Sequence, residues 1–234
     1  MNLENLTKII DIPLFWEYRQ TYISGLIYNF YVFALAGLLA VTAGCFISLL
    51  RLSRNRIYRS IGTFYVELFR NAPEYVLLVW MHYVFPLLLT VLLNHKFNFS
   101  PILSAVLALG MAYSGYFAET FRAGIQAIPK THIESGWALG MSKFLVMRRI
   151  IFPQAVRQML PETLNQFISL FKATTLVSLI SVPDLLYQVT IITQQEMRPL
   201  PLYSSAAIIY FVLIFFFSTL VDMFSEKWRT RGMA

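Results

Sequence analysis

Polar side chains that could bind a small charged solute occur inside apolar segments of the sequence. Lys172 follows Glu162 by about ten residues, so on a helix it lies roughly 15 Å along its segment, near the middle of a bilayer. An ammonium group there is costly unless it meets water or a partner, and it could meet a carboxylate of the solute. A structural ion pair or contacts with backbone carbonyls would explain it equally well. The other candidates for this polar path are Thr174, Thr175, Ser178 and Glu119.

Each of these four candidates has a simpler explanation. Serine and threonine hydroxyls in membrane helices often bond only their own backbone. Glu119 is better placed to pair with Arg122, one turn later, than to bind a solute. The chemistry suggested by these residues is therefore binding.

Motifs for catalysis are absent from the sequence. No glycine is followed by lysine, so the phosphate-binding pattern G-x-x-x-x-G-K-[ST] cannot occur, and the metalloprotease pattern H-E-x-x-H and hydrolase pattern G-x-S-x-G are missing too. We therefore expect no enzyme activity, metal or cofactor in this chain. The missing motifs argue against a membrane-embedded enzyme.

The composition indicates an all-α integral membrane protein. Of 234 residues, 57% are hydrophobic and 13% charged, and the mean hydropathy is +0.60. A membrane helix needs roughly 20 apolar residues. Five such spans are predicted in a single domain over residues 1–234, at about 22–50, 73–93, 101–125, 160–192 and 202–222. Pro183 is expected to break the fourth span near the outer face, either as part of a gate or as a plain helix end.

The basic residues indicate the orientation, since cytoplasmic loops are enriched in lysine and arginine. The net charge of +7 therefore mostly reflects topology, and nucleic-acid binding is not expected. One side of the predicted membrane holds Arg51, Arg54, Arg56, Arg59, Lys130, Lys143, Arg148, Arg149, Arg157, Lys227, Arg229 and Arg231, and the other holds Lys8, Arg19, Lys96 and Arg198. This places the N-terminus outside and the C-terminus in the cytoplasm.

Two cytoplasmic segments have helical patterns of their own. Residues 55–71 space apolar and charged residues as in an amphipathic helix leading into the second span. In the loop at 130–153, Thr131 and Glu134 match the capping-box pattern that begins a helix. Gly140 can end that helix, Ser142 can cap a second one, and Pro153 is expected to end the second.

The same loop identifies a family. Its sequence "ESGWALGMSKFLVMRRIIFPQAVRQMLP" resembles the EAA loop of ABC importer permeases, with Glu134, Gly140, Ile150 and Pro153 at matching positions and Ser135, Gly136 and Phe152 as departures. The segments "YVELFRNAP", "YFAETFRAGIQAIPK" and "NQFISLFKATTLVSLISVPDLL" resemble the permeases of polar amino acid uptake systems, and the resemblance covers roughly residues 20–225.

This resemblance implies a type I importer fold in the bacterial inner membrane and an amino acid as cargo. It implies a second permease subunit, identical or related, and an extracytoplasmic amino acid-binding protein. Two cytosolic ATPases would bind ATP and magnesium and contact the loop as a coupling helix. A self-sufficient secondary carrier or channel is the alternative, although it has no need of such a loop. The residues predicted to contact the ATPase are Thr131, Glu134, Ser135, Gly136, Trp137, Ala138, Gly140, Met141 and Pro153.

Overall fold

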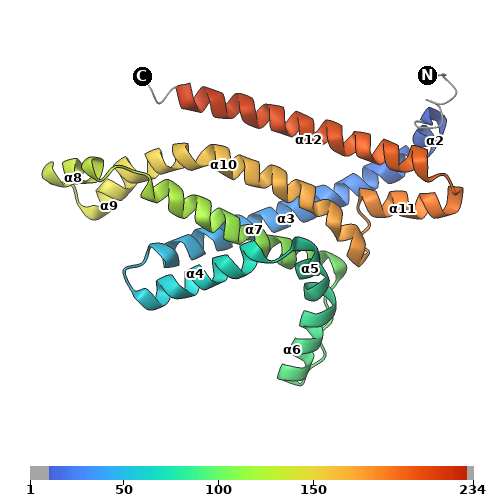
Figure 1. The fold of residues 1–234 in the computed structure, drawn as a ribbon, viewed down its shortest axis with the longest axis horizontal. Coiled ribbons are helices and arrows are strands. Elements are labelled where there is room, and N and C mark those ends of the chain that lie inside the picture. The colour runs from blue at the N-terminus through green and yellow to red at the C-terminus, as the bar shows by residue number, and fades with distance from the viewer. Residues whose placement is uncertain (1–10, 231–234) are drawn as a thin grey trace. The chain divides into compact units, whose positions relative to one another are not determined.

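The computed structural model describes residues 11–230, and the side chains of residues 11–223. Every regular element in this part of the chain is a helix (Figure 1). In chain order these are α2 (Ile12–Glu17), α3 (Arg19–Leu52), α4 (Arg56–Asn71), α5 (Glu74–Val79), the π-helical η1 (Trp80–Val84), α6 (Phe85–Leu93), α7 (Pro101–Gln126), α8 (Lys130–Ala138), α9 (Lys143–Val146), the π-helical η2 (Met147–Ile151), α10 (Phe152–Ala173), the 3₁₀ helix η3 (Thr174–Ile180), α11 (Leu185–Glu196) and α12 (Pro199–Thr230).

The helices match the predicted membrane architecture. Four described helices are long and apolar enough to cross a membrane, namely Arg19–Leu52, Glu74–Leu93, Pro101–Gln126 and Pro199–Met223. A fifth span is added if the pair Lys143–Ile180 and Leu185–Glu196, bent by 44°, is counted as one. The predicted all-α membrane fold is thus confirmed, with four or five spans by length and composition.

The predicted fourth span differs from a simple helix. It was expected over 160–192 with a break at Pro183, and the chain passes from α10 into η3 and then breaks at Ser181, whose φ of 63° is left-handed. Asp184 begins α11 by accepting a hydrogen bond from the Tyr187 amide at 3.0 Å. The break expected at Pro183 is therefore confirmed, because proline cannot continue a helical hydrogen-bond pattern and favours an extended residue before it.

The described chain divides into two compact units, each assembled from segments far apart in the sequence. Unit 1 contains the described residues up to Leu38, Pro73–Gly110 and Ser169–Phe217. Unit 2 contains Leu39–Ala72, Met111–Ile168 and the described residues from Ser218 onward. The long helices α3, α7, α10 and α12 each contribute residues to both units.

Unit 1 is built around α11. Its apolar core joins α2, the first part of α3, α11 and the start of α12, through Leu14, Tyr22, Leu185, Val189, Ile192, Leu202 and Ala206. In the same unit, α5 packs against η3. The following helix α6 exposes large apolar side chains, among them Leu87, Val91 and Leu92, as expected of a helix that faces lipid or another apolar surface.

Unit 2 contains a helical hairpin made by the end of α3 and by α4. Asn55 caps α4 by accepting a hydrogen bond from the Ile57 amide at 2.9 Å. Val66 of α4 packs against Ile47 of α3 and Ala118 of α7, so α4 runs back alongside α3. The helix predicted at 55–71 is confirmed, and its apolar side chains Ile57, Ile61, Phe64 and Leu68 are exposed.

Candidate functional sites: the α8–α9 hairpin and a polar cavity

The first candidate site is the α8–α9 hairpin, defined as α8, α9 and the turn between them. Gly140 ends α8 with a φ of +75°, as predicted from its place in the sequence. The Gly140 amide donates to the Trp137 carbonyl at 2.9 Å, and the Met141 amide donates to the Gly136 carbonyl at 3.0 Å. This pair of bonds is the Schellman motif, which needs a left-handed residue at the position of Gly140. Ser142 then caps α9, as predicted, by accepting from the Leu145 amide.

Two predicted details of this hairpin are wrong. Thr131 does not cap α8, which begins at Lys130 with Pro129 as its cap and no side-chain capping bond. A capping hydroxyl requires an extended backbone, and Thr131 is already inside the helix, where its carbonyl accepts from the Ser135 hydroxyl at 2.8 Å. The helix starts early because proline has a fixed φ suited to this position, which is −56° here.

Pro153 does not end the second helix. It is the second residue of α10, which follows the π-helical turn η2 directly. In η2 the Phe152 amide reaches back five residues to the Met147 carbonyl. Pro153 has a bulky ring and lacks an amide hydrogen. The wider turn before it and its position at the start of α10 accommodate both features.

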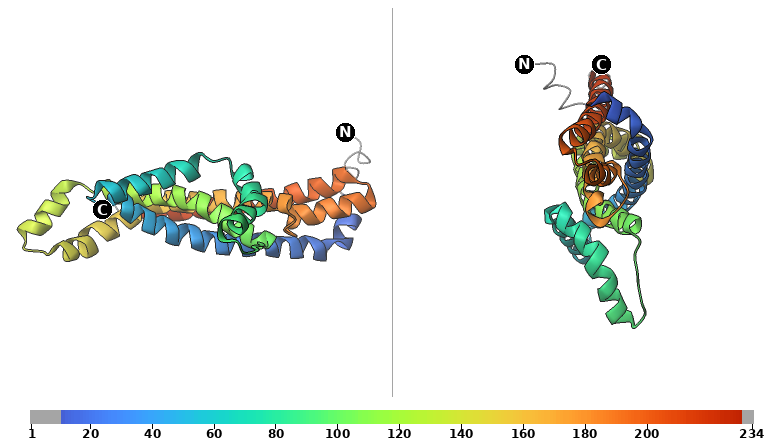
Figure 2. Two further views of the ribbon diagram at one scale, coloured as in Figure 1. Left: turned by 90° about the horizontal axis from the view of Figure 1, so that it is seen from below. Right: turned by 90° about the vertical axis from the view of Figure 1, so that its right-hand side faces the viewer.

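The α8–α9 hairpin shares an apolar core with the residues on either side of it. Ile128, Val146, Ile151 and Ala155 are buried there, and Ile133 and Met141 pack against them. Figures 1 and 2 show α8 and α9 beyond the ends of α7 and α10, which all belong to unit 2 in this region. The core fixes the hairpin as a folded element rather than a loose loop.

The outer surface of the hairpin is apolar at several positions. Trp137 is 51% exposed and Leu139 81% exposed, and Phe144, Met147 and Phe152 are exposed as well. Of the other predicted contact residues, Glu134, Ser135 and Ala138 are exposed, whereas Gly136 is buried against Val146 and Ile150. Exposed aromatic side chains on a rigid element are typical anchors of a protein interface.

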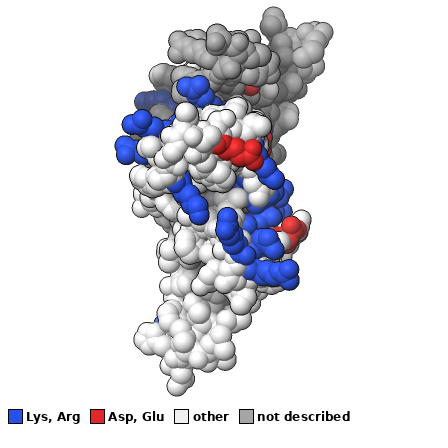
Figure 3. Space-filling view, turned by 90° about the vertical axis from the view of Figure 1, so that its left-hand side faces the viewer, with Lys and Arg blue, Asp and Glu red and all other residues white. Residues whose placement is uncertain are grey.

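Basic side chains surround this apolar surface. Figure 3 shows lysines and arginines gathered on the face seen from the left of Figure 1. The exposed basic residues of unit 2 include Arg54, Arg56, Arg59, Lys130, Lys143, Arg148, Arg149 and Arg157. Such a concentration is typical of the cytoplasmic side of a membrane protein.

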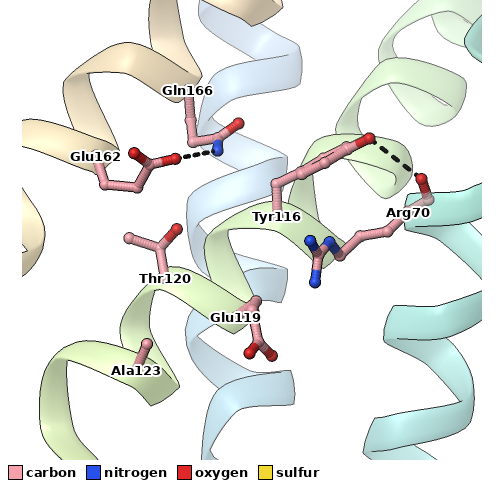
Figure 4. A pocket seen from close by; sticks show the side chains of 7 residues that line it. All are labelled: Arg70, Tyr116, Glu119, Thr120, Ala123, Glu162 and Gln166. Atoms are coloured by element: carbon pink, nitrogen blue, oxygen red, sulfur yellow. Dashed lines mark hydrogen bonds between the residues drawn. The ribbon is translucent and has the colours of Figure 1, made fainter. Parts of the chain in front are cut away.

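The second candidate site is a cavity of about 220 Å³ in unit 2, shown in Figure 4. Arg70 and Tyr116 line one side and Glu162 and Gln166 the other, with Glu119, Thr120 and Ala123 between them. A neighbouring cavity of about 210 Å³ shares Thr120, Ala123 and Glu162. Sequence reasoning identified only Glu119 among these residues, because Arg70, Tyr116 and Glu162 come from three separate segments.

Arg70 and Glu162 keep their charges free for a ligand. The Arg70 guanidinium lies over the Tyr116 ring, with Cζ 5.3 Å from the ring centroid, and the Tyr116 hydroxyl donates to the Arg70 carbonyl at 3.1 Å. Glu162 accepts one hydrogen bond from the Gln166 amide at 2.8 Å. Among the described side chains neither residue forms an ion pair.

Glu119, in contrast, is already neutralised. Both Arg51 of α3 and Arg122 of α7 form ion pairs with its carboxylate, and Arg122 Nε donates to it at 3.2 Å. The pairing with Arg122 was the expected alternative to a role in binding. Glu119 lines the cavity, yet its charge is offset by two arginines.

The remaining predicted path residues all belong to unit 1. Lys172 is exposed at the end of α10, and the Thr175 hydroxyl donates to its carbonyl at 2.8 Å. The Ser178 hydroxyl donates to the Thr175 carbonyl at 3.0 Å, so both hydroxyls bond their own backbone. Thr174 is buried and accepts a hydrogen bond from Asn29. None of the four residues lines the cavity, and their role in a path stays a prediction.

Comparison with known proteins identifies relatives over most of the chain. Residues 21–230 match the model of a family described as binding-protein-dependent transport system inner membrane component. The arginine ABC transporter permease protein ArtQ of Haemophilus influenzae is 37% identical over 169 residues, which are 71% of this chain and 76% of ArtQ. The probable amino-acid permease protein YxeN of Bacillus subtilis is 28% identical over 223 residues, which are 92% of this chain and 98% of YxeN.

A solved structure is similar over nearly the same range. It is described as the crystal structure of an amino acid ABC transporter with histidines, and its sequence is 32% identical. The match covers 93% of this chain and 99% of the chain in that structure, with a TM-score of 0.83. The predicted type I importer fold is therefore confirmed.

Proposed function

The chain belongs to the family of binding-protein-dependent transport system inner membrane components, and we propose that it is the permease subunit of an ATP-driven amino acid importer whose ATPase contacts the α8–α9 hairpin. The observation that carries this proposal is the hairpin itself, which packs on an apolar core shared with the flanking residues and leaves Trp137 and Leu139 exposed. A permease of this family has no ATPase motif and must receive energy from a separate subunit. A rigid, apolar projection is suited to transmit force to a protein partner.

The proposed partners follow from this role. A second permease subunit completes the translocation path, cytosolic ATPases bind ATP and magnesium, and an extracytoplasmic protein delivers the substrate. The basic residues around the hairpin support its placement in the cytoplasm, with the N-terminus outside. Binding of a loaded delivery protein outside favours the outward-facing state only through a difference in affinity for the two states.

An amino acid as substrate is supported by the cavity and by the relatives. Free amino acids carry a carboxylate and an ammonium group, and the cavity offers one free cation, Arg70, and one free carboxylate, Glu162. Arg70 is suited to bind the carboxylate because a guanidinium forms two parallel hydrogen bonds with it. Glu162 is suited to bind the ammonium group. Relatives named for arginine and for amino acids in general transport the same chemical class.

Replacement of Gly140 tests the coupling role. No atom lies within 4 Å of a Cβ built on Gly140, so a side chain there has space within this chain. We expect Gly140→Asp to reduce co-purification of the ATPase and ATP-driven uptake by at least tenfold, because the new carboxylate would enter the interface. Gly140→Asn is the matched control for backbone strain, since asparagine also tolerates a positive φ. Full ATPase binding and uptake in Gly140→Asp would refute the assignment.

A further inference from the structure

Both ends of α11 are hydrogen-bonded to the segment between Tyr18 and Asn29. Asn29 follows Tyr18 by eleven positions and Glu196 follows Leu185 by eleven, which corresponds to about 16 Å of helix in each case. Asn29 bonds the first residue of α11, and Tyr18 bonds the last. The two segments therefore lie antiparallel and in register within unit 1.

The inner attachment is a buried hydrogen-bond network around Asn29 of α3. Its side-chain oxygen accepts from the Leu185 amide at 3.1 Å, and its nitrogen donates to Asp184 at 3.2 Å and to the Thr174 hydroxyl at 3.1 Å. The Tyr210 hydroxyl of α12 donates to the Asn29 oxygen at 3.2 Å. One amide side chain thus connects α3, η3, α11 and α12.

Asp184 depends on this network because its side chain is fully buried. No lysine or arginine pairs with it among the residues whose side chains are described. Its side chain instead accepts a hydrogen bond from the amide of Tyr187 at the N-terminus of α11. Moving α11 away from Asn29 would remove the Asn29 donor from the buried Asp184 side chain and leave the Leu185 amide without its acceptor, which is unfavourable.

Gly25 brings the two backbones into direct contact. A Cβ on Gly25 would lie 2.6 Å from the Leu185 Cα and 2.7 Å from the Leu185 nitrogen. Backbone atoms cannot move aside as a flexible side chain can, so only glycine permits this approach. The contact lies one helical turn before Asn29. Gly25 and Asn29 thus form one joint between α3 and α11.

The outer attachment joins the ends of the same two segments. The Tyr18 hydroxyl donates to Glu196 at 2.5 Å, and Arg198 forms an ion pair with Asp11 at 2.7 Å. The bond to Glu196, together with desolvation, raises the pKa of Tyr18 to about 12, so the hydroxyl remains a donor at physiological pH. With both ends attached, α11 cannot pivot about its first residue without breaking one of the two attachments.

We propose that Gly25 and Asn29 are positioning residues that fix α11 to α3, so that the bend at Ser181–Asp184 keeps its geometry throughout the transport cycle. The bend at Pro183 is then a rigid elbow, and it moves with α3 as one body instead of opening as a gate. This inference rests on the proposed function in one respect: the transport cycle supplies the conformational change during which the bend keeps its geometry.

Hydrogen exchange of the assembled transporter tests the proposal. The amides of Leu185 and Tyr187 are bonded to Asn29 and Asp184, so exchange in peptides covering residues 181–196 reports on the joint. The complex in lipid nanodiscs is compared without nucleotide and after trapping with ATP, vanadate and the loaded delivery protein. We expect the exchange rates to agree within about threefold. A change of more than tenfold between the two states would overturn the rigid elbow.

Variants then test whether the two residues transmit motion. We expect Asn29→Leu and Gly25→Ala to raise exchange in this segment more than tenfold in both states. They should also abolish stimulation of the ATPase by the delivery protein while basal hydrolysis remains. Ile27→Leu, at an exposed position of the same helix, is the control and should change neither readout. Asp184→Asn should retain stimulation, because asparagine can still accept the capping bond.

The outcomes separate this proposal from the proposed function. Unchanged exchange and full stimulation in Asn29→Leu would refute the positioning role while leaving the importer assignment intact. Absence of uptake in the wild-type complex would instead count against the importer assignment, and the exchange comparison would still be measured. If the variants fail to assemble, the comparison of the two wild-type states decides.

Discussion

Each unit contains a carboxyl group held between packed helices, and the two units hold it in opposite ways. In unit 1, Asp184 is fully buried and accepts hydrogen bonds from the Asn29 side chain and from the Tyr187 amide. In unit 2, Glu119 is partly exposed and is held by two arginines. Neutral donors cannot be screened by salt, whereas partly exposed ion pairs can. The first arrangement suits a fixed joint, and the second suits a surface that contacts water.

Asp184→Leu should have the largest effect on stability. The leucine leaves Asn29 and the Tyr187 amide without an acceptor in a buried site, and we expect a loss of about 2–3 kcal/mol. Thermal unfolding of the detergent-purified complex measures this loss. Asp184→Asn should cost much less, since it keeps an acceptor in the same place. Equal losses for both variants would mean that the joint needs the charge itself.

Gly140→Ala should have the next largest effect, in the α8–α9 hairpin of unit 2. A left-handed conformation costs a residue with a Cβ about 1–2 kcal/mol, and no steric contact adds to this cost. We expect the hairpin to become more sensitive to limited proteolysis, with Gly140→Asn closer to the wild type. If Gly140→Ala were digested at the same rate as the wild type, the turn would not require this conformation in solution.

Glu119→Gln should destabilise the protein less, by about 1 kcal/mol, because its arginine partners are only partly buried. The Arg51 and Arg122 side chains are 13% and 24% exposed. We expect this loss to shrink in 1 M salt and the loss for Asp184→Leu to stay constant, as measured by thermal unfolding. The same salt dependence for both variants would remove the contrast between the two units.

Asp11→Asn should have the smallest effect on stability. Asp11 lies at the outer attachment of unit 1. The hydrogen bond from the Leu14 amide, with the Arg198 guanidinium nearby, holds the pKa of Asp11 below its usual range, although burial opposes the shift. A lowered pKa contributes stability above the unfolded-state value of about 4, and this contribution is lost as the pH falls through the lowered value. The difference in Tm between wild type and Asp11→Asn should therefore be constant from pH 8 to 5 and shrink below pH 4. A difference that grows on acidification would contradict this.

Sequence alone predicted the elements whose signals are local. The lengths of the apolar runs predicted the helices, and Gly140 and Ser142 predicted the caps at the hairpin turn. Pro183 predicted the break in the fourth span. Thr131 and Pro153 were misread because each was judged from its own pattern, whereas the cap at Pro129 and the π-helical turn before α10 decided the outcome.

The polar clusters could not be predicted because they join distant residues. Asn29, Asp184 and Tyr210 are separated by up to 181 positions, and neither Asn29 nor Tyr210 is unusual in its local sequence. Asp184 carried a usable signal, since an acid in an apolar span needs a partner. Arg70 and Glu162 were missed for the same reason as Asn29 and Tyr210: they line one cavity only when α4, α7 and α10 are packed together.

Photo-crosslinking from two exposed tryptophan positions tests the central claim most directly. Trp137 on the α8–α9 hairpin is 51% exposed, and Trp16 on α2 is 64% exposed, so a photoreactive amino acid at either site should leave the fold intact. In the assembled complex we predict crosslinks from position 137 to the ATPase and none from position 16. Failure of position 137 to reach the ATPase, or its capture of the extracytoplasmic delivery protein instead, would contradict the account.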